Sequence, residues 1–252
     1  MLKAVIIAFS TYSKVPMPQV EWSEKNMRYA VCFFPLVGVV AGALLLGWCW
    51  LCQALALTPV FRAAGGVIVP LLVSGGIHMD GWCDTADALA SHQERERKLE
   101  ILKDSHTGAF AVIACGGWLL LDFGALTQPA DWESWGIIAL GFVLSRALSG
   151  LALANFRGAR RVGMLQSFAG AARRGVVTGT MVAYGILAGA GMVLLSPVSG
   201  GIALAAALVC FGYYRWMAYR QFGGVTGDLA GFFLQLCELS VALSAALTWR
   251  WV

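Results

Sequence analysis

Charged residues are scarce in this sequence. Lys, Arg, Asp and Glu make up 13% of the 252 residues, whereas hydrophobic residues make up 59%. Soluble domains contain about 25% charged and about 45–50% apolar residues. A disordered chain would be polar and highly charged, so disorder is excluded. The apolar residues come in long blocks rather than at amphipathic spacing, which indicates a polytopic membrane protein.

Several other signatures are missing. The 30 glycines show no three-residue period, which excludes a collagen-like repeat. The seven cysteines are odd in number and mostly lie in or beside apolar blocks, so no disulfide framework is expected. Cys49 and Cys52 have CxxC spacing without a second pair or a nearby His, so we interpret them as lipid-facing or core thiols. Residues 2–9 are apolar but lack a small-residue cleavage site, so they are not interpreted as a cleavable signal.

Seven apolar segments are candidates for membrane spans. A helix needs about 20 apolar residues to cross the hydrocarbon core, and one segment is shorter than that. The segments are 30–51, 63–78 (the short one), 109–127, 135–154, 176–196, 202–219 and 229–249. Gly38 and Gly42 have the GxxxG spacing of close helix packing. We predict an all-α, polytopic integral membrane helix bundle of about seven transmembrane helices. Residues 1–252 would form a single membrane-embedded domain.

The basic residues orient these spans. Cytoplasmic loops of membrane proteins are enriched in Lys and Arg. With the N-terminus in the cytoplasm, only Arg62 and Arg250 fall outside, and Arg146 lies within a span. The basic residues placed inside are Lys3, Lys14, Lys25, Arg28, Arg95, Arg97, Lys98, Lys103, Arg157, Arg160, Arg161, Arg173, Arg174, Arg215 and Arg220. Topology therefore explains the net charge of +4, and no nucleic-acid partner is predicted.

An aspartate cluster follows the second predicted span. On a helix, Asp80, Asp84 and Asp87 stand at i, i+4 and i+7, within about 60° on one face. Carboxylates that close repel each other unless a cation lies among them, and such hard oxygen ligands suit Mg²⁺ or Mn²⁺. The alternative is an ordinary acidic loop. However, such loops usually interleave acidic with basic residues, as 91–100 does, and 80–87 contains no basic residue.

His78 ends that span two residues before the first aspartate. On a regular helix its side chain points away from the carboxylate face. A general-base role and a packing role both remain open.

A second cluster, residues 221–228, comes immediately before the last span. Glycines 223, 224 and 227 let the backbone turn its N–H groups toward a phosphate, and the start of the next helix adds a favourable dipole. Asp228 would repel that phosphate unless a metal bridges the two. The alternative is a plain Gly-rich turn capped by Asp228. We expect this turn to meet the aspartate cluster and complete a phosphate site.

Three charged residues lie inside predicted spans: Asp122, Arg146 and Glu238. Buried intramembrane charges are costly and usually face a partner or a cavity. Two interpretations of Arg146 remain open, namely a structural ion pair with Glu238 and a contact with a substrate phosphate. Asp122 has no assigned role.

At these residues the sequence resembles the cobalamin synthase family, the adenosylcobinamide-GDP ribazoletransferases. The matching stretches cover nearly the whole chain: 34–38, 75–87, Lys103, Asp104, Ser105, Gly108, Ser145, Arg146, 223–228 and Glu238. The block from Asp80 to Asp87 is the most specific of them.

The resemblance implies a Mg²⁺-dependent transferase of cobalamin biosynthesis in the bacterial inner membrane, with its active site facing the cytoplasm. α-Ribazole, free or as its 5′-phosphate, attacks adenosylcobinamide-GDP and GMP leaves. The partners are these substrates and the lipid bilayer, and a homo-oligomer is left open. The predicted catalytic residues are Asp80, Asp84, Asp87 and Asp104, which with Asp228 are also the predicted metal ligands. The predicted substrate-binding residues are His78, Lys103, Ser105, Arg146, Gly223, Gly224, Thr226, Gly227 and Glu238.

A cation-coupled secondary transporter is the alternative from another class, because charged residues lie within spans. The aspartate cluster lies at the end of a span rather than at the bilayer midplane, and no inverted repeat is visible. Both features favour the enzyme.

Overall fold

The computed structural model describes residues 1–160 and 163–251, so Arg161 lies outside the described residues. Helices dominate it, and the only β-bridge among the described residues joins Gly158 to Val225. The helices are α1 (Leu2–Tyr12), α2 (Glu24–Met27), α3 (Phe34–Ala54), α4 (Pro59–Ser74), α5 (Ile77–Ala90), α6 (Arg95–Ile101), α7 (Ala109–Leu126), α8 (Trp132–Asn155), α9 (Met164–Ala171), α10 (Arg174–Leu195), α11 (Pro197–Met217) and α12 (Gly227–Thr248). Short helical turns η1 (Ala30–Phe33), η2 (Ala218–Phe222) and η3 (Trp249–Trp251) extend α3, α11 and α12.

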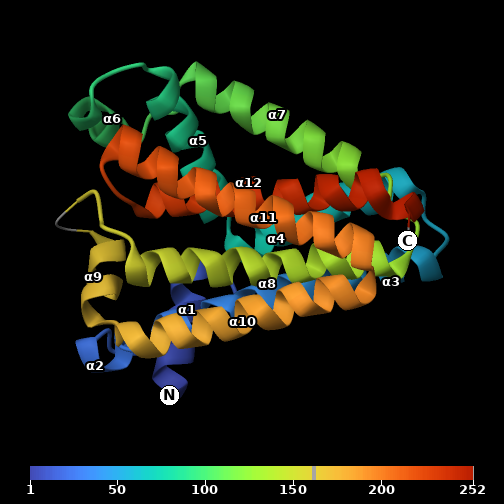
Figure 1. The fold of residues 1–252 in the computed structure, drawn as a ribbon, viewed down its shortest axis with the longest axis horizontal. Helices are drawn as coiled ribbons and strands as arrows, with labels where there is room; N and C mark the ends of the chain where they lie inside the picture. Colours follow the sequence, from blue (N-terminus) through green and yellow to red (C-terminus); the bar gives the residue numbers. More distant parts are fainter. Residues whose placement is uncertain (161–162, 252) are drawn as a thin grey trace.

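The prediction of a multi-pass membrane bundle is confirmed. Among the described residues, six helical segments are long and apolar enough to cross a membrane, and the bent pair α4–α5 would make a seventh. The six contain α3, α7, α8, α10, α11 and α12, and each overlaps a predicted span. Figure 1 shows these helices side by side along the long axis of the molecule.

Helices α8 and α12 form the centre of the bundle. In each, 78% of the most apolar window is buried, against 28% in α7 and α10, whose remaining surface is available to lipid. Helix α3 packs so closely on α8 that a side chain would not fit between them at two glycines. A Cβ at Gly38 would meet the backbone of Phe142, and a Cβ at Gly42 would meet the backbone of Ala139. The close-packing interpretation of the GxxxG spacing is therefore confirmed.

The predicted span 63–78 is wrong at its end. Helix α4 begins earlier, at Pro59, with Thr58 as its N-cap, and it stops at Ser74. Gly75 and Gly76 then adopt left-handed conformations with φ of 64° and 80°, which glycine adopts at little steric cost. The chain turns by 94°, so His78 lies in α5 instead of ending the span.

Helix α5 runs across the bundle near the end where α12 begins (Figure 1). By itself α5 is not among the six segments that are long and apolar enough to cross a membrane. Helices α6 and α9 lie at the same end of the molecule in Figure 1. The helices that carry the aspartate cluster, the Gly-rich turn before α12 and most of the predicted inside loops thus share one end of the bundle.

The cysteines agree with the sequence analysis. All seven are free, and Cys49 and Cys52 are buried in the bundle as core thiols.

Candidate functional site

Helix α5 presents the three aspartates on one face, as the spacing predicts. It packs against the first turn of α12 with almost no side chain between the two backbones. A Cβ at Gly81 would lie 2.5 Å from the Asp228 carbonyl oxygen, and a Cβ at Gly231 would lie 3.1 Å from the His78 carbonyl oxygen. This close approach places Asp228 beside the aspartate cluster, so the expected meeting of the two segments is confirmed.

The aspartate cluster contains more carboxylates than neighbouring cations. The pKa of Asp84 is raised to about 7 by its burial and by the nearby carboxylates of Asp80, Asp228 and Asp87. One cation approaches from the other side, since Arg160 Nη1 lies 3.6 Å from Asp228 Oδ2. The site therefore holds more negative charge than its own side chains neutralise.

Asp87 has a second function in the structure. Its Oδ2 accepts a hydrogen bond from the Gly108 backbone N–H at 2.6 Å, and its Oδ1 accepts one from Ala111 N–H at 2.9 Å. Asp87 thereby satisfies two backbone donors at the start of α7, which have no partner within the helix. Because each carboxylate oxygen has two acceptor sites, Asp87 can still contribute to the cluster.

The loop from Lys103 to Ser105 is exposed. Asp104 accepts hydrogen bonds from the backbone N–H and the ring Nδ1 of His106, and these bonds lower the pKa of the Asp104 carboxyl. The structure thus gives Asp104 a local partner, and it leaves Lys103 and Ser105 open to solvent.

The Gly-rich turn is held by the chain rather than left open. Thr226 caps α12 by accepting a hydrogen bond from Leu229 N–H. A Cβ at Gly224 would meet the backbone of 157–159, so peptide groups fill the space in which a phosphate was expected. In the same contact Val225 N–H donates to the Arg157 carbonyl at 2.9 Å, and Ala159 N–H donates to the Val225 carbonyl at 2.9 Å.

Basic side chains gather around this turn. A Cβ at Gly223 would meet the Arg95 guanidinium, and Arg157 Nε donates to the Gly223 carbonyl at 3.0 Å. Arg160 Nη2 donates to the Leu99 carbonyl. The sequence analysis assigned these arginines only to membrane orientation. The high number of arginines in the loop that contains Arg157 and Arg160 was the available signal, but the pairing of Arg160 with Asp228 required the fold.

A pocket of 320 Å³ opens beside the cluster, and Asp80 and Asp228 line one part of it. Its apolar wall contains four aromatic residues: Tyr12, Phe34, Phe168 and Tyr214. The ring centroids of Tyr12 and Phe34 lie 4.1 Å apart, and Tyr12 and Phe168 lie 6.0 Å apart. Sequence reasoning missed Tyr12 and Phe168, since no motif surrounds either residue.

Arg146 and Glu238 lie in the bundle interior. Arg146 Nη1 binds Glu238 Oε1 at 2.7 Å, and Ser145 Oγ donates to the same oxygen at 2.8 Å. Arg146 is 1% exposed. The ion-pair interpretation is confirmed, and the predicted contact of these two side chains with substrate does not follow from their placement.

No three His, Cys, Asp or Glu side chains in the described part of the chain are grouped so that they could hold a metal ion by themselves. The donor set at Asp80, Asp84 and Asp228 is nevertheless suited to Mg²⁺. This ion is usually bound by one or two carboxylates together with waters and substrate phosphates, and it does not need a cage of protein ligands.

Comparison with known proteins places the chain among close relatives. A family model described as cobalamin-5-phosphate synthase matches residues 4–246. A protein of Lachnoclostridium phytofermentans named adenosylcobinamide-GDP ribazoletransferase is 47% identical over 246 residues, which cover 98% of this chain and 94% of the relative. Proteins of the same name from Pseudomonas fluorescens and Listeria monocytogenes are 34% and 30% identical, covering 96% and 98% of the chain and 98% and 99% of the relatives. No solved structure matches.

Proposed function

The chain belongs to the cobalamin-5-phosphate synthase family, and on that premise we propose that the pocket between α5 and the start of α12 is its active site. The chain is an adenosylcobinamide-GDP ribazoletransferase, which assembles the nucleotide loop of cobalamin. It joins α-ribazole, or its 5′-phosphate, to adenosylcobinamide-GDP with release of GMP.

One observation carries the assignment: Asp80 and Asp84 on α5 lie against Asp228 on α12, and burial together with the neighbouring carboxylates raises the pKa of Asp84 to about 7. A divalent cation would relieve this repulsion. We assign Mg²⁺ to Asp80, Asp84 and Asp228, with Asp87 and Asp104 as further ligands. When bound, Mg²⁺ would neutralise the charge that develops on the phosphoryl oxygens.

The chain's own residues position the substrate diphosphate. The bond that forms joins the ribazole oxygen to the phosphorus that carries cobinamide, and the bond that breaks joins this phosphorus to the oxygen of the departing GMP. Arg160, Arg157 and Arg95 surround the 223–228 turn and offer positive charge to the diphosphate. Arginine suits this role, because its planar fork of donors matches phosphate oxygens.

The aromatic wall suits the base of ribazole. A planar, largely apolar base is stabilised by stacking and by burial of its surface. Tyr12, Phe34 and Phe168 provide such a surface in the same pocket as Asp80 and Asp228. The acceptor would therefore place its base against the aromatic wall and its reactive oxygen toward the aspartates.

The site end of the bundle faces the cytoplasm in our proposal. The basic loops lie at this end, as the positive-inside rule requires, and Arg62 and Arg250 belong to the opposite side. Residues 1–252 would then act as one membrane-embedded catalytic domain in the bacterial inner membrane. The substrates and the bilayer are its partners, and homo-oligomerisation stays a prediction.

Asp84→Asn tests the proposal, because it keeps the shape of the side chain and removes its charge. In the presence of Mg²⁺ the purified protein should release GMP from adenosylcobinamide-GDP when α-ribazole is added. Chelating the Mg²⁺ with EDTA should stop this release. Asp84→Asn should abolish release without lowering expression. Glu96→Gln removes an exposed carboxylate from α6 at the same end of the bundle and should leave release unchanged. Near-normal release by Asp84→Asn in saturating Mg²⁺ would contradict the assignment.

A further inference from the structure

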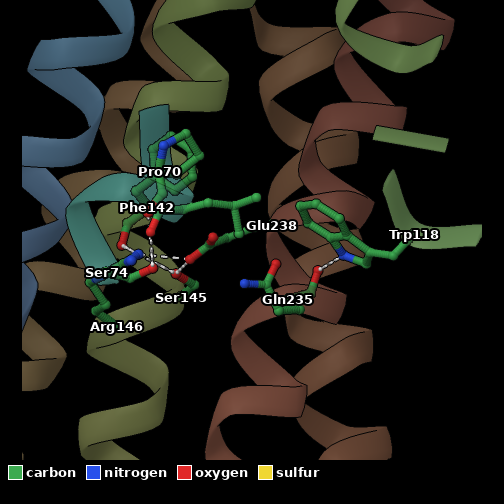
Figure 2. Close-up of polar contacts among 9 residues, drawn as sticks. Pro70, Ser74, Trp118, Phe142, Ser145, Arg146, Gln235 and Glu238 are labelled. Carbon is green, nitrogen blue, oxygen red and sulfur yellow. Dashed lines mark hydrogen bonds and ion pairs between the residues drawn. The ribbon is translucent and has the colours of Figure 1, made fainter. Parts of the chain in front are cut away.

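A small cavity with both apolar and polar lining residues lies inside the bundle, between α4, α7, α8 and α12. It measures 20 Å³, and its lining includes Asp122 of α7, Arg146 of α8, and Gln235 and Glu238 of α12. Figure 2 shows Arg146, Ser145 and Glu238 joined by hydrogen bonds, with Gln235 on the same helix as Glu238. A cavity of this size holds one particle about as large as a water molecule.

Two groups that line this cavity lack, within residues 1–160 and 163–251, a partner of the kind that burial normally requires: the Asp122 carboxylate has no ion pair, and Gln235 Oε1 has no hydrogen bond. Asp122 is 6% exposed, and it takes part in none of the ion pairs formed by the described residues. Gln235 is 3% exposed, and its side-chain Oε1 is buried without a hydrogen bond. Only the backbone carbonyl of Gln235 is used, by Trp118 Nε1 at 3.0 Å. Buried polar groups are normally satisfied, so Gln235 Oε1 points to a ligand in the cavity, and the Asp122 carboxylate lies beside it in the same lining.

The charge of the cavity shows what kind of ligand it needs. Arg146 neutralises Glu238 through their 2.7 Å ion pair, whereas Asp122 has no such counter-charge. A single water would supply hydrogen bonds but would leave one negative charge buried in the membrane, which is costly. A divalent ion would reverse the charge, and Mg²⁺ also requires about six ligands in rigid octahedral geometry. One positive charge balances the cavity.

We propose that Asp122, Gln235 and Glu238 form a site for one monovalent cation, either a sodium ion or a proton. The cation would link α7 to α12 in the bundle interior. This site is separate from the one at Asp80 and Asp228, although His78 lines both cavities. The proposal does not depend on the Mg²⁺ assignment.

Thermal unfolding of the purified full-length protein in detergent tests the sodium arm. Sodium chloride is titrated against choline chloride at constant ionic strength. If sodium fills the site, each tenfold rise above its Kd should raise the wild-type Tm by roughly 3–6 °C. Asp122→Asn removes the charge and should abolish this response. Glu133→Gln removes an exposed carboxylate at the start of α8 and should respond like wild type.

To test whether a proton fills the site, the Tm of the same variants is measured at several pH values in choline chloride without sodium. The charged or titratable groups that face Asp122 are Glu238 from α12, Arg146 from α8 and His78 from α5. If a proton fills the site, the native state binds one proton more than the unfolded state, so the wild-type Tm should fall as the pH rises. The Tm of Asp122→Asn should lack this part of the pH dependence. Any pH dependence that comes from the other groups should be the same in the variant and in the wild type.

Gln235→Leu keeps the charges and removes one oxygen ligand. About tenfold more sodium should then be needed to raise the Tm by the same amount. This variant tests the proposal if Asp122→Asn does not fold. Equal responses of wild type and both variants to sodium and to pH would overturn the proposal.

Discussion

Replacing Gly81 with alanine tests how closely α5 and α12 must approach. A Cβ at position 81 would lie 2.5 Å from the Asp228 carbonyl oxygen, whereas ordinary contact begins at 3.4 Å. Because the obstacle is backbone, it cannot rotate away, and the two helices must separate by about 0.9 Å, the difference between these distances. Asp80 and Asp84 would then move away from Asp228 by a similar amount.

Gly81→Ala should change both the rate of GMP release and the stability of the protein. A misplacement of about 1 Å in a catalytic site can cost about 100-fold in rate. Overpacking a close interface costs about 1–3 kcal/mol, which lowers the Tm of a chain of this size by roughly 2–12 °C. We therefore expect Gly81→Ala to fold, to unfold several degrees earlier and to lose about 100-fold in kcat for GMP release.

Gly42→Ala is the matched control. Its Cβ would lie 2.9 Å from the Ala139 carbonyl oxygen, in the interface of α3 with α8. It should lower Tm by a comparable amount and keep kcat within a few-fold of wild type. Gly81→Ala with wild-type kcat, despite a lowered Tm, would refute the idea that the spacing of α5 and α12 sets the active site.

Three further outcomes are expected. Asp87→Ala leaves two backbone donors of α7 unpaired, so it should lower stability by about 0.5–2 kcal/mol, seen as a decrease in Tm that Asp104→Ala does not share. Arg146→Met leaves Glu238 buried without its counter-charge and should cost about 3–5 kcal/mol in thermal unfolding; adding Glu238→Met should restore most of it, and an unchanged loss would argue against the pair. Arg95→Cys, in an otherwise cysteine-free and active background, should be labelled by a membrane-impermeant maleimide only from the cytoplasmic side, and periplasmic labelling would reverse the orientation.

The membrane helices could be predicted well because hydrophobic length alone decides them. Segment 109–127 became α7 with a difference of one residue at its end, and 30–51 became η1 with α3. The bend after α4 was missed, since a run of apolar residues continues through Gly75 and Gly76 to Met79. Nothing in the local sequence states that both glycines adopt positive φ.

The candidate site was only partly readable from sequence. Helical periodicity places Asp80, Asp84 and Asp87 on one face, and shared sidedness brings the turn at Asp228 to the same end. Periodicity cannot show that Asp87 faces the start of α7, because that contact joins residues more than twenty positions apart. The aromatic wall depends on α1 and α9 folding over the pocket, which no short-range pattern encodes.

A crystal structure of the full-length protein soaked with Mn²⁺ and GMP would test the Mg²⁺ assignment most directly. Mn²⁺ takes similar oxygen ligands and scatters anomalously, so it marks its own position. We expect an anomalous peak between the carboxylates of Asp80, Asp84 and Asp228, with a GMP phosphate oxygen completing the coordination. A peak away from these three residues, or phosphate bound there with no metal at saturating Mn²⁺, would contradict the assignment.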